Sequence, residues 1–292
     1  MSEYQLVVDV RNALGEGPLW VPREQALYWL DITGRQVLRY DPVTSTHETL
    51  DVDIPITVLG MREGGGFVAG TVHGFAFWDP APPANLHTIV DLVADRPAMR
   101  FNDGKVDPRG SFWAGTMNDD NPLQPDGVLF RLDPDRSVRQ MGSGYTVSNG
   151  IGWSLDHSTM YYTDTLRLVI YAFDYDHATG AIENRRPFIE VPVGEGFPDG
   201  MTVDSEGFIW SAHWGGWKVV RYDPQGKPER EITLPAAQVS CPAFGGANLD
   251  ELYLTTARKG LTEDDLRAQP LAGGLFRVDP GVKGLEEACF KG

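Results

Sequence analysis

The sequence predicts an all-β fold, a six-bladed β-propeller with four antiparallel strands in each blade, formed by residues 1–292 as a single domain. One pattern occurs six times along the chain: an aromatic or β-branched run, a gap, and a second run that ends in an acidic residue, usually followed by proline. The copies recur every ~40 to 55 residues, which is the period of four short strands in a propeller blade. The acidic residues that end the copies are Asp41, Asp79, Asp133, Asp174, Asp223 and Asp279. A single blade leaves its hydrophobic face uncovered, so the repeats need one another and predict one domain.

Local signals favour short strands joined by tight turns. Residues 127–132 and 218–222 alternate between apolar and polar side chains with the period of a β-strand. The 33 glycines and 21 prolines suit many turns rather than long helices. Residues 107–110 and 204–207 are predicted to form matching turns between the first two strands of blades 3 and 5, while acids such as Asp133 are expected to cap turns at the outer edge of the blades.

Two segments are expected to depart from the repeat. Residues 262–267 are the longest helical candidate, in which Thr262 could cap the N-terminus and acidic residues follow in the first turn. Residues 4–10 precede the first full repeat. We expect them to supply an N-terminal strand that closes the last blade, because this removes two exposed sheet edges.

Charge and cysteine content limit the classes of partner and location. The net charge of −16 argues against a nucleic-acid partner, since polyphosphate binding needs a basic surface. Cys241 and Cys289 are too few for a disulfide framework. Residues 1–5 do not read as the start of a signal peptide, and no apolar run approaches the ~20 residues needed to cross a bilayer. We therefore expect a cytoplasmic protein, a monomer or weak homo-oligomer, with no nucleic-acid or membrane partner.

One loop of each blade should open at the mouth of the central channel, and four of these loops carry an oxygen-bearing side chain close to a glycine. Counting back from the first aromatic run of each blade places these side chains in register: Glu16, Asn102, Asn149 and Asp199. In blades 2 and 6 the loops are interpreted as residues 58–60 and 244–246, which carry no such side chain.

Two carboxylates and two amides without a soft ligand are typical of a site for one divalent cation. Oxygen donors suit Ca²⁺, Mg²⁺ or Mn²⁺, and carboxylates with amides also hold Zn²⁺ or Fe²⁺. The alternative is that Asn-Gly and Asp-Gly simply form turns, which is their commonest role. The shared register favours the cation, because carboxylates that converge on a narrow channel repel each other unless a cation lies between them.

Several short motifs carry a resemblance to a known family. They cover essentially the whole chain in the same order: residues 14–18, 100–105, 113–117, 148–150, 171–175, 198–201, 241–246 and 272–276. Through them the chain resembles the SMP-30/regucalcin/gluconolactonase family of six-bladed propellers, and within it the bacterial sugar (aldono) lactonases.

The resemblance implies a lactonase, a carboxylic ester hydrolase that converts an aldono-1,4- or 1,5-lactone such as xylonolactone or gluconolactone to the aldonic acid. It implies that the metal ligands are Glu16, Asn149 and Asp199. Asn102 matches a residue on the water or substrate side of the metal, and Arg100 one that contacts substrate oxygens. Asp119 stands where the regucalcins have a glutamate, so we expect it to bind sugar hydroxyls with a shorter reach.

Asp199 is the expected general base, since a carboxylate beside the metal can take the proton from attacking water. No Gly-x-Ser-x-Gly elbow supplies a serine nucleophile. His213 and His73 are further candidates for lining the channel, with hydrogen bonding inside the barrel as the alternative. The competing functions are metal-dependent hydrolysis of other activated esters of the organophosphate type, a non-catalytic Ca²⁺-binding regulator, and an interaction scaffold.

Overall fold

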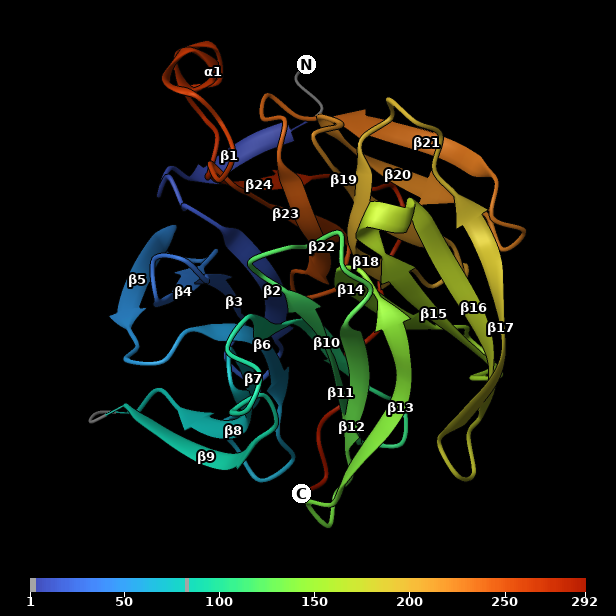
Figure 1. Ribbon diagram of the computed structural model, residues 1–292. Coiled ribbons are helices and arrows are strands. Elements are labelled where there is room, and N and C mark those ends of the chain that lie inside the picture. The colour runs from blue at the N-terminus through green and yellow to red at the C-terminus, as the bar shows by residue number, and fades with distance from the viewer. Residues whose placement is uncertain (1–3, 82–83) are drawn as a thin grey trace. The chain divides into compact units, whose positions relative to one another are not determined.

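The structure is a computed structural model that describes residues 4–81 and 84–292. This described part contains 24 β-strands in six four-stranded antiparallel sheets, with one short α-helix and one 3₁₀-helix (Figure 1). The sheets are the blades of a six-bladed β-propeller, which confirms the predicted fold class. The interpretation of residues 1–5 rests partly on residues 1–3, which lie outside the described residues. In the described part, no helix has the length and apolar character needed to span a membrane.

The blades follow one another in the sequence. Blade 1 consists of β2 (Gly15–Val21), β3 (Ala26–Asp31), β4 (Gln36–Asp41) and β5 (Thr46–Asp51). Blade 2 consists of β6 (Ile56–Met61), β7 (Phe67–Thr71), β8 (Gly74–Asp79) and β9 (Asn85–Asp91). Blade 3 consists of β10 (Met99–Val106), β11 (Phe112–Asn118), β12 (Gly127–Leu132) and β13 (Val138–Tyr145). Blade 4 consists of β14 (Ser148–Trp153), β15 (Thr159–Asp164), β16 (Val169–Asp176) and β17 (Ala181–Glu190), with the 3₁₀-helix η1 (Thr165–Arg167) after β15. Blade 5 consists of β18 (Phe197–Val203), β19 (Ile209–Trp214), β20 (Lys218–Tyr222) and β21 (Pro228–Thr233). Blade 6 consists of β22 (Val239–Gly245), β23 (Glu251–Thr256), β24 (Leu275–Val278) and β1 (Tyr4–Val8), with α1 (Glu263–Ala268) between β23 and β24.

The N-terminal strand completes the last blade, as the sequence predicted. β1 pairs antiparallel with β24, with Tyr4 opposite Val278 and Leu6 opposite Phe276. The rings of Tyr4 and Phe276 meet edge to face with their centroids 5.7 Å apart. The edge of β24 is therefore covered by the first strand of the chain, which protects it from pairing with another molecule.

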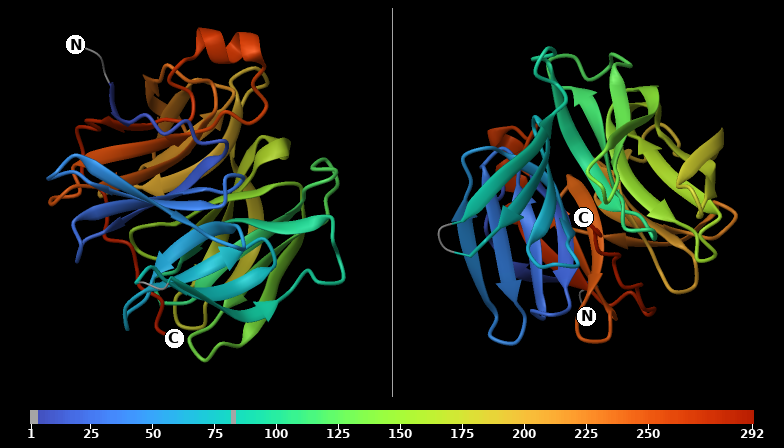
Figure 2. Two further views of the ribbon diagram at one scale, coloured as in Figure 1. Left: turned by 90° about the vertical axis from the view of Figure 1, so that its left-hand side faces the viewer. Right: turned by 90° about the horizontal axis from the view of Figure 1, so that it is seen from below.

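The predicted helix is also confirmed. Thr262 Oγ1 accepts a hydrogen bond from Asp265 N, and the Asp265 carboxylate accepts one from Thr262 N, so both ends of a capping box are present. No residue of α1 is buried, and the helix projects from blade 6 (Figure 2).

Contacts within the chain group the blades into two units. Unit 1 comprises the residues up to Pro55 together with Val191–Glu286 and holds blades 1, 5 and 6. Unit 2 comprises Ile56–Glu190 with Glu287–Gly292 and holds blades 2, 3 and 4. Within unit 2, the C-terminal Phe290 is fully buried and its backbone pairs with that of Arg62. That residues 1–292 form a single domain stays a prediction.

The matching turns predicted in blades 3 and 5 are confirmed, and each rests on one buried aspartate. Asp107 Oδ1 accepts from the backbone N–H groups of Arg109 and Ser111, while its Oδ2 accepts from the indole N–H of Trp113 at 2.8 Å. Asp204 does the same in blade 5, where Trp210 donates to Oδ2 at 2.9 Å. Each carboxylate thereby satisfies turn N–H groups and orients a core tryptophan of its blade.

Four of the six acids that end the repeats cap turns, as expected. The expectation was wrong for Asp133, whose carboxylate accepts from Ser111 Oγ, Arg131 and Arg139, and for Asp174, whose carboxylate accepts from Asn184 and Arg186. Asp41 Oδ1 accepts from the backbone N–H groups of Val43 and Thr44. Asp79, Asp223 and Asp279 each accept from the N–H group two residues further on. These bonds satisfy backbone donors where the chain reverses direction.

Candidate functional site

The first strand of every blade contains a β-bulge near its start, where extra residues break the pairing register. The four candidate oxygen-bearing residues lie at or directly beside these bulges: Glu16, Asn102, Asn149 and Asp199. A bulge bends the strand and re-aims its side chains, which is why bulges are frequent next to active sites. The shared register inferred from the sequence therefore has a common structural cause.

The bulges also correct one expectation. In β6 the extra residue is Thr57, and in β22 it is Ser240. Blades 2 and 6 thus do carry an oxygen-bearing side chain at this position, and the interpretation based on residues 58–60 and 244–246 was wrong. Residues 244–245 end β22 rather than begin it. Both hydroxyls donate to backbone carbonyl oxygens, Thr57 to Gly70 at 3.3 Å and Ser240 to Gly15 at 2.6 Å.

Unit 1 contains the two candidate carboxylates. Glu16 on β2 is 8% exposed, and its Oε2 accepts from the backbone N–H of Gly17 at 3.1 Å. The segment before it is held by Asp31, whose carboxylate accepts from the N–H groups of Ala13 and Leu14. Asp199 lies in the bulge of β18 and is 3% exposed. Two buried carboxylates in one unit require nearby donors or a cation, since burial disfavours the charged form.

Unit 2 contains Arg100, Asn102 and Asp119, which form one hydrogen-bonded chain. Arg100 Nε donates to Asp119 Oδ1 at 2.8 Å, and Nη1 donates to Asn102 Oδ1 at 2.7 Å. Asn102 Nδ2 in turn donates to the backbone carbonyl of Ser148 at 2.8 Å. The sequence placed these three residues together only by resemblance, and the structure brings them into contact.

Asn149 on β14 presents a buried amide oxygen. The side chain is 4% exposed, and Nδ2 donates to Thr165 Oγ1 at 2.9 Å, which fixes which way the amide points. Within residues 4–81 and 84–292, its Oδ1 atom is buried and accepts no hydrogen bond. Buried carbonyl oxygens almost always have a partner, so this atom fits a cation ligand of the oxygen-donor type.

The expected ligands are one amide and two carboxylates, with Asn149 in unit 2 and Glu16 and Asp199 in unit 1. In the part of the chain that the structure describes, no group of three or more His, Cys, Asp or Glu side chains is arranged to hold a metal ion. The expected ligand set contains only two side chains of these types, Glu16 and Asp199, because its third member is the amide of Asn149.

Two residues that orient the candidates were missed from the sequence. Ser148 receives the Asn102 amide on its carbonyl, and its Oγ donates to the carbonyl of Thr116 at 2.8 Å. Thr165, the first residue of η1, receives the Asn149 amide. The signal for Ser148 was its position directly before Asn149, whereas nothing in the local pattern marks Thr165.

Asp103 follows Asn102 in the bulge of β10. Its Oδ1 accepts from the backbone N–H of Gly104 at 2.7 Å. Desolvation nevertheless raises the pKa of Asp103 to about 6, against the opposite influence of the Gly104 hydrogen bond and the Lys105 charge. Unit 2 therefore also holds a carboxyl group whose pKa burial raises above the usual value for aspartate.

The two histidines differ in their surroundings. His213 is 1% exposed, with Nδ1 2.8 Å from the carbonyl oxygen of Glu195 and Nε2 3.1 Å from the hydroxyl of Tyr222. Burial lowers the pKa of His213. Both ring nitrogens thus have partners inside unit 1, in line with the alternative role considered for it. His73 is exposed in the turn between β7 and β8.

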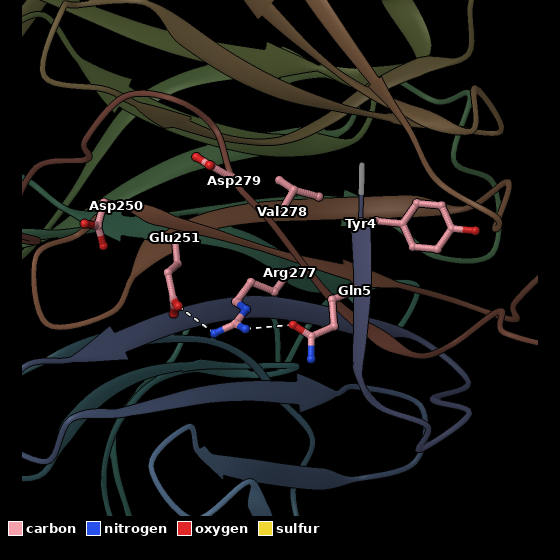
Figure 3. A pocket seen from close by; sticks show the side chains of 7 residues that line it. All are labelled: Tyr4, Gln5, Asp250, Glu251, Arg277, Val278 and Asp279. Atoms are coloured by element: carbon pink, nitrogen blue, oxygen red, sulfur yellow. Dashed lines mark hydrogen bonds and ion pairs between the residues drawn. The ribbon is translucent and has the colours of Figure 1, made fainter. Parts of the chain in front are cut away.

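Two cavities in the described part lie away from all these residues. One of about 570 Å³ lies beside β1 and β24 in unit 1 (Figure 3) and is lined by Tyr4, Gln5, Asp250, Glu251, Arg277, Val278 and Asp279. There Arg277 donates to both Glu251 and Gln5, so its charge is already engaged within the cavity wall. The other, of about 490 Å³, is lined in unit 2 by Arg131, Arg139, Gln140, Met141, Thr179 and Ala181.

The chain is similar to proteins along its whole length. Residues 14–258 match the model of the SMP-30/gluconolactonase/LRE-like region. Regucalcin of Xenopus laevis is 39% identical over 298 residues, covering 99% of this chain and 98% of the relative. A solved structure of a calcium-binding protein, regucalcin from Agrobacterium tumefaciens, superimposes with a TM-score of 0.92 at 27% identity, covering 98% and 96% of the two chains. A luciferin-regenerating enzyme superimposes with a TM-score of 0.91 at 32% identity, covering 99% of both chains. This chain therefore belongs to the SMP-30/gluconolactonase/LRE-like family.

Proposed function

We propose that this protein is a lactonase that uses one divalent cation to hydrolyse a sugar lactone, an aldono-1,4- or 1,5-lactone such as xylonolactone or gluconolactone, to the aldonic acid. The observation that carries the proposal is the buried Oδ1 of Asn149, which lies beside the bulge of its first strand, as Glu16 lies beside and Asp199 lies in the bulges of theirs. The family description includes gluconolactonases, which supports the substrate class.

Glu16, Asn149 and Asp199 are the proposed ligands. Their oxygen donors suit Ca²⁺, and the regucalcin structure of Agrobacterium tumefaciens is described as calcium-binding. Zn²⁺, Mn²⁺, Mg²⁺ and Fe²⁺ accept the same donor types and stay in the proposal. When bound, such a cation supplies Lewis acidity toward a lactone carbonyl and a water molecule.

The chain's own residues supply orientation and proton transfer. The hydrogen bonds from Arg100 to Asp119 and Asn102 fix the plane of its guanidinium, which is proposed to donate to substrate oxygens, where negative charge grows during the reaction. Asp119 is 47% exposed and is proposed to accept hydrogen bonds from sugar hydroxyls.

Asp199 is the proposed general base. It removes a proton from water as the water oxygen bonds to the lactone carbonyl carbon. When the bond between that carbon and the ring oxygen breaks, the proton passes to the ring oxygen, which becomes the new hydroxyl. The sum is one lactone plus one water giving one hydroxy acid.

The test is an activity panel with purified, metal-stripped protein. Glucono-, xylono-, galactono- and arabinonolactone are assayed by acid release, with each metal added back separately and phosphotriesters run in parallel. We expect metal-dependent turnover of at least one lactone, and its loss in Asp199→Asn, which keeps the shape of the side chain. Cleavage of phosphotriesters without turnover of any lactone overturns the proposal, and retention of most activity in Asp199→Asn removes the assigned base.

A second candidate is a non-catalytic Ca²⁺-binding regulator, favoured by the name regucalcin of relatives such as that of Xenopus laevis. The same panel separates the two functions. Calorimetric Ca²⁺ binding that is lost in Asp199→Asn, with no turnover under any metal, supports the regulator. A cytoplasmic location and a monomeric or weakly self-associating state complete the proposal. They are checked by fractionation and by light scattering during gel filtration.

A further inference from the structure

Within unit 1, one strand contacts both strands that carry a candidate carboxylate. β22 of blade 6 packs against β2, which bears Glu16, and against β18, which bears Asp199 (Figure 1). Two consecutive residues at its bulge take part in these contacts, Ser240 with β2 and Cys241 with β18.

Ser240 is hydrogen-bonded to the backbone of β2. It is fully buried, and its hydroxyl donates to the carbonyl oxygen of Gly15, the residue before Glu16, at 2.6 Å. Because a carbonyl only accepts, the Ser240 hydrogen is committed to Gly15. Ser240 Oγ also lies 2.8 Å from Thr255 Oγ1, which can donate to it. Gly15 itself lies so close to β23 that an added β-carbon would stand 2.3 Å from the Thr256 carbonyl oxygen.

Cys241 packs against the backbone of β18. It is 7% exposed and packs against Gly200, the residue after Asp199. A β-carbon added to Gly200 would stand 2.3 Å from Cys241 Sγ and 2.6 Å from Cys241 Cβ, so the backbone of β18 rests directly on this side chain. Because atoms in protein interiors are already at packing distance, the Cys241 side chain limits how closely this part of β18 can approach β22.

We propose that Ser240 and Cys241 are positioning residues that set the separation of the two carboxylates, and so the size of cation that the site accepts. Ser240 pulls the backbone beside Glu16 toward β22, and Cys241 limits the approach of the backbone beside Asp199. The inference rests on the proposed function, because it assumes that both carboxylates bind one ion. It adds that their spacing is fixed from the neighbouring blade.

The experiment measures binding rather than turnover. Metal-stripped wild type, Ser240→Ala and Cys241→Ala are titrated with Ca²⁺ and with Mg²⁺ by calorimetry. Loss of one buried hydrogen bond should weaken Ca²⁺ binding by about fivefold in Ser240→Ala. Mg²⁺ binding should weaken more, because Mg²⁺ demands short oxygen distances of about 2.0–2.1 Å whereas Ca²⁺ accepts about 2.3–2.6 Å with flexible geometry. The ratio of Ca²⁺ to Mg²⁺ affinity should therefore rise in Ser240→Ala. It should fall in Cys241→Ala, because removing the sulfur lets the backbone beside Asp199 approach β22 and suits the smaller ion.

Thr57→Val is the matched control. Thr57 occupies the same bulge position in blade 2, but its hydroxyl bonds to Gly70 within its own blade. We expect it to lower the melting temperature without changing the affinity ratio. A general loosening of bulges would change the ratio in all three variants and would overturn the inference.

The remaining outcomes separate this inference from the proposed function. If wild type binds the cation and Asp199→Asn does not, an unchanged ratio in Ser240→Ala and Cys241→Ala rejects the positioning role and leaves the metal site standing. If wild type binds no divalent cation, both ideas fail. Cys241→Ala, which removes only the sulfur, keeps the test decisive should Ser240→Ala not fold.

Discussion

Arg100 donates from Nε to Asp119 Oδ1 at 2.8 Å, in a pair whose arginine side chain is 11% exposed and whose aspartate side chain is 47% exposed. The exposed member can meet an incoming molecule while the buried member is tied to Asn102. A ligand that binds Asp119 therefore meets an Arg100 guanidinium whose orientation is already fixed by these two hydrogen bonds. Such preorganisation is what gives hydrogen-bond donors their effect in a site.

Asp119→Ala should raise KM for the lactone by about tenfold and lower kcat less, because it removes a substrate contact and one of the bonds that orient Arg100. Asp119→Glu should restore KM in part and change the order of preference among the lactones, since its carboxylate reaches further. Steady-state kinetics on the four lactones provides the measurement. Asp120→Ala, at the exposed neighbouring position, serves as the control. An unchanged KM in Asp119→Ala contradicts the assigned role.

Gly115→Ala should destabilise the protein and weaken cation binding. A β-carbon at Gly115 would stand 2.3 Å from Ser148 Cβ and 2.7 Å from the Tyr162 hydroxyl, so β14 must shift and move Asn149 with it. Overpacking of this kind costs about 1–3 kcal/mol. Gly64→Ala is the control, because an added β-carbon there meets no atom within 4 Å. Thermal unfolding and Ca²⁺ titration are the measurements, and equal melting temperatures for the two variants would refute the expectation.

Asp204→Ala should cost about 3–5 kcal/mol of unfolding free energy, the range for breaking a buried ion pair. Asp204 is fully buried, and its Oδ2 accepts from both Trp210 and Arg221. The control is Asp174→Ala, which removes an exposed ion pair with Arg186 and should have a much smaller effect. Denaturant titration of the three proteins gives the comparison. Similar losses in both variants would show that burial does not decide the effect.

His213 should make the protein less stable in mild acid. Burial lowers its pKa in the folded state, so below about pH 6.5 the unfolded chain binds a proton that the folded chain does not. The stability that neutral His213 contributes is present above that pH and is lost as the pH falls toward the lowered folded-state pKa. His213→Gln should show a shallower decline of unfolding free energy between pH 7 and pH 5, measured by denaturant titration. His73→Gln, at an exposed site, should decline like wild type.

The blades could be predicted from the sequence because buried aromatic residues recur in their second strands. Trp113 on β11 and Trp210 on β19 are examples. The sequence-based prediction was wrong at the start of blade 6, because it placed the channel-mouth loop at residues 244–246, which include the Gly245–Gly246 pair. Ser240 stands before Tyr253 at the interval that separates Glu16 from Trp29, so the same count applied to blade 6 would have found it.

Two hydrogen bonds of the candidate site could not be predicted from sequence patterns. The bond from Ser240 to Gly15 joins residues separated by most of the chain. The bond from Asn149 to Thr165 depends on η1, a single turn with no sequence signal of its own. Such contacts follow from how packed strands meet, whereas periodicity reports only which face of a strand is buried.

The pairing of β1 with β24 has a consequence for synthesis. β1 leaves the ribosome before its partner β24, and more than 260 residues lie between them (Val8 to Leu275). At ~5–20 residues per second, the first strand waits on the order of tens of seconds with its backbone unpaired. Blade 6 is thus the last blade that can be completed, and a nascent chain stalled before Leu275 exposes a strand edge at each of its ends. Molecular chaperones that bind exposed strand edges should therefore bind stalled nascent chains more strongly than completed chains.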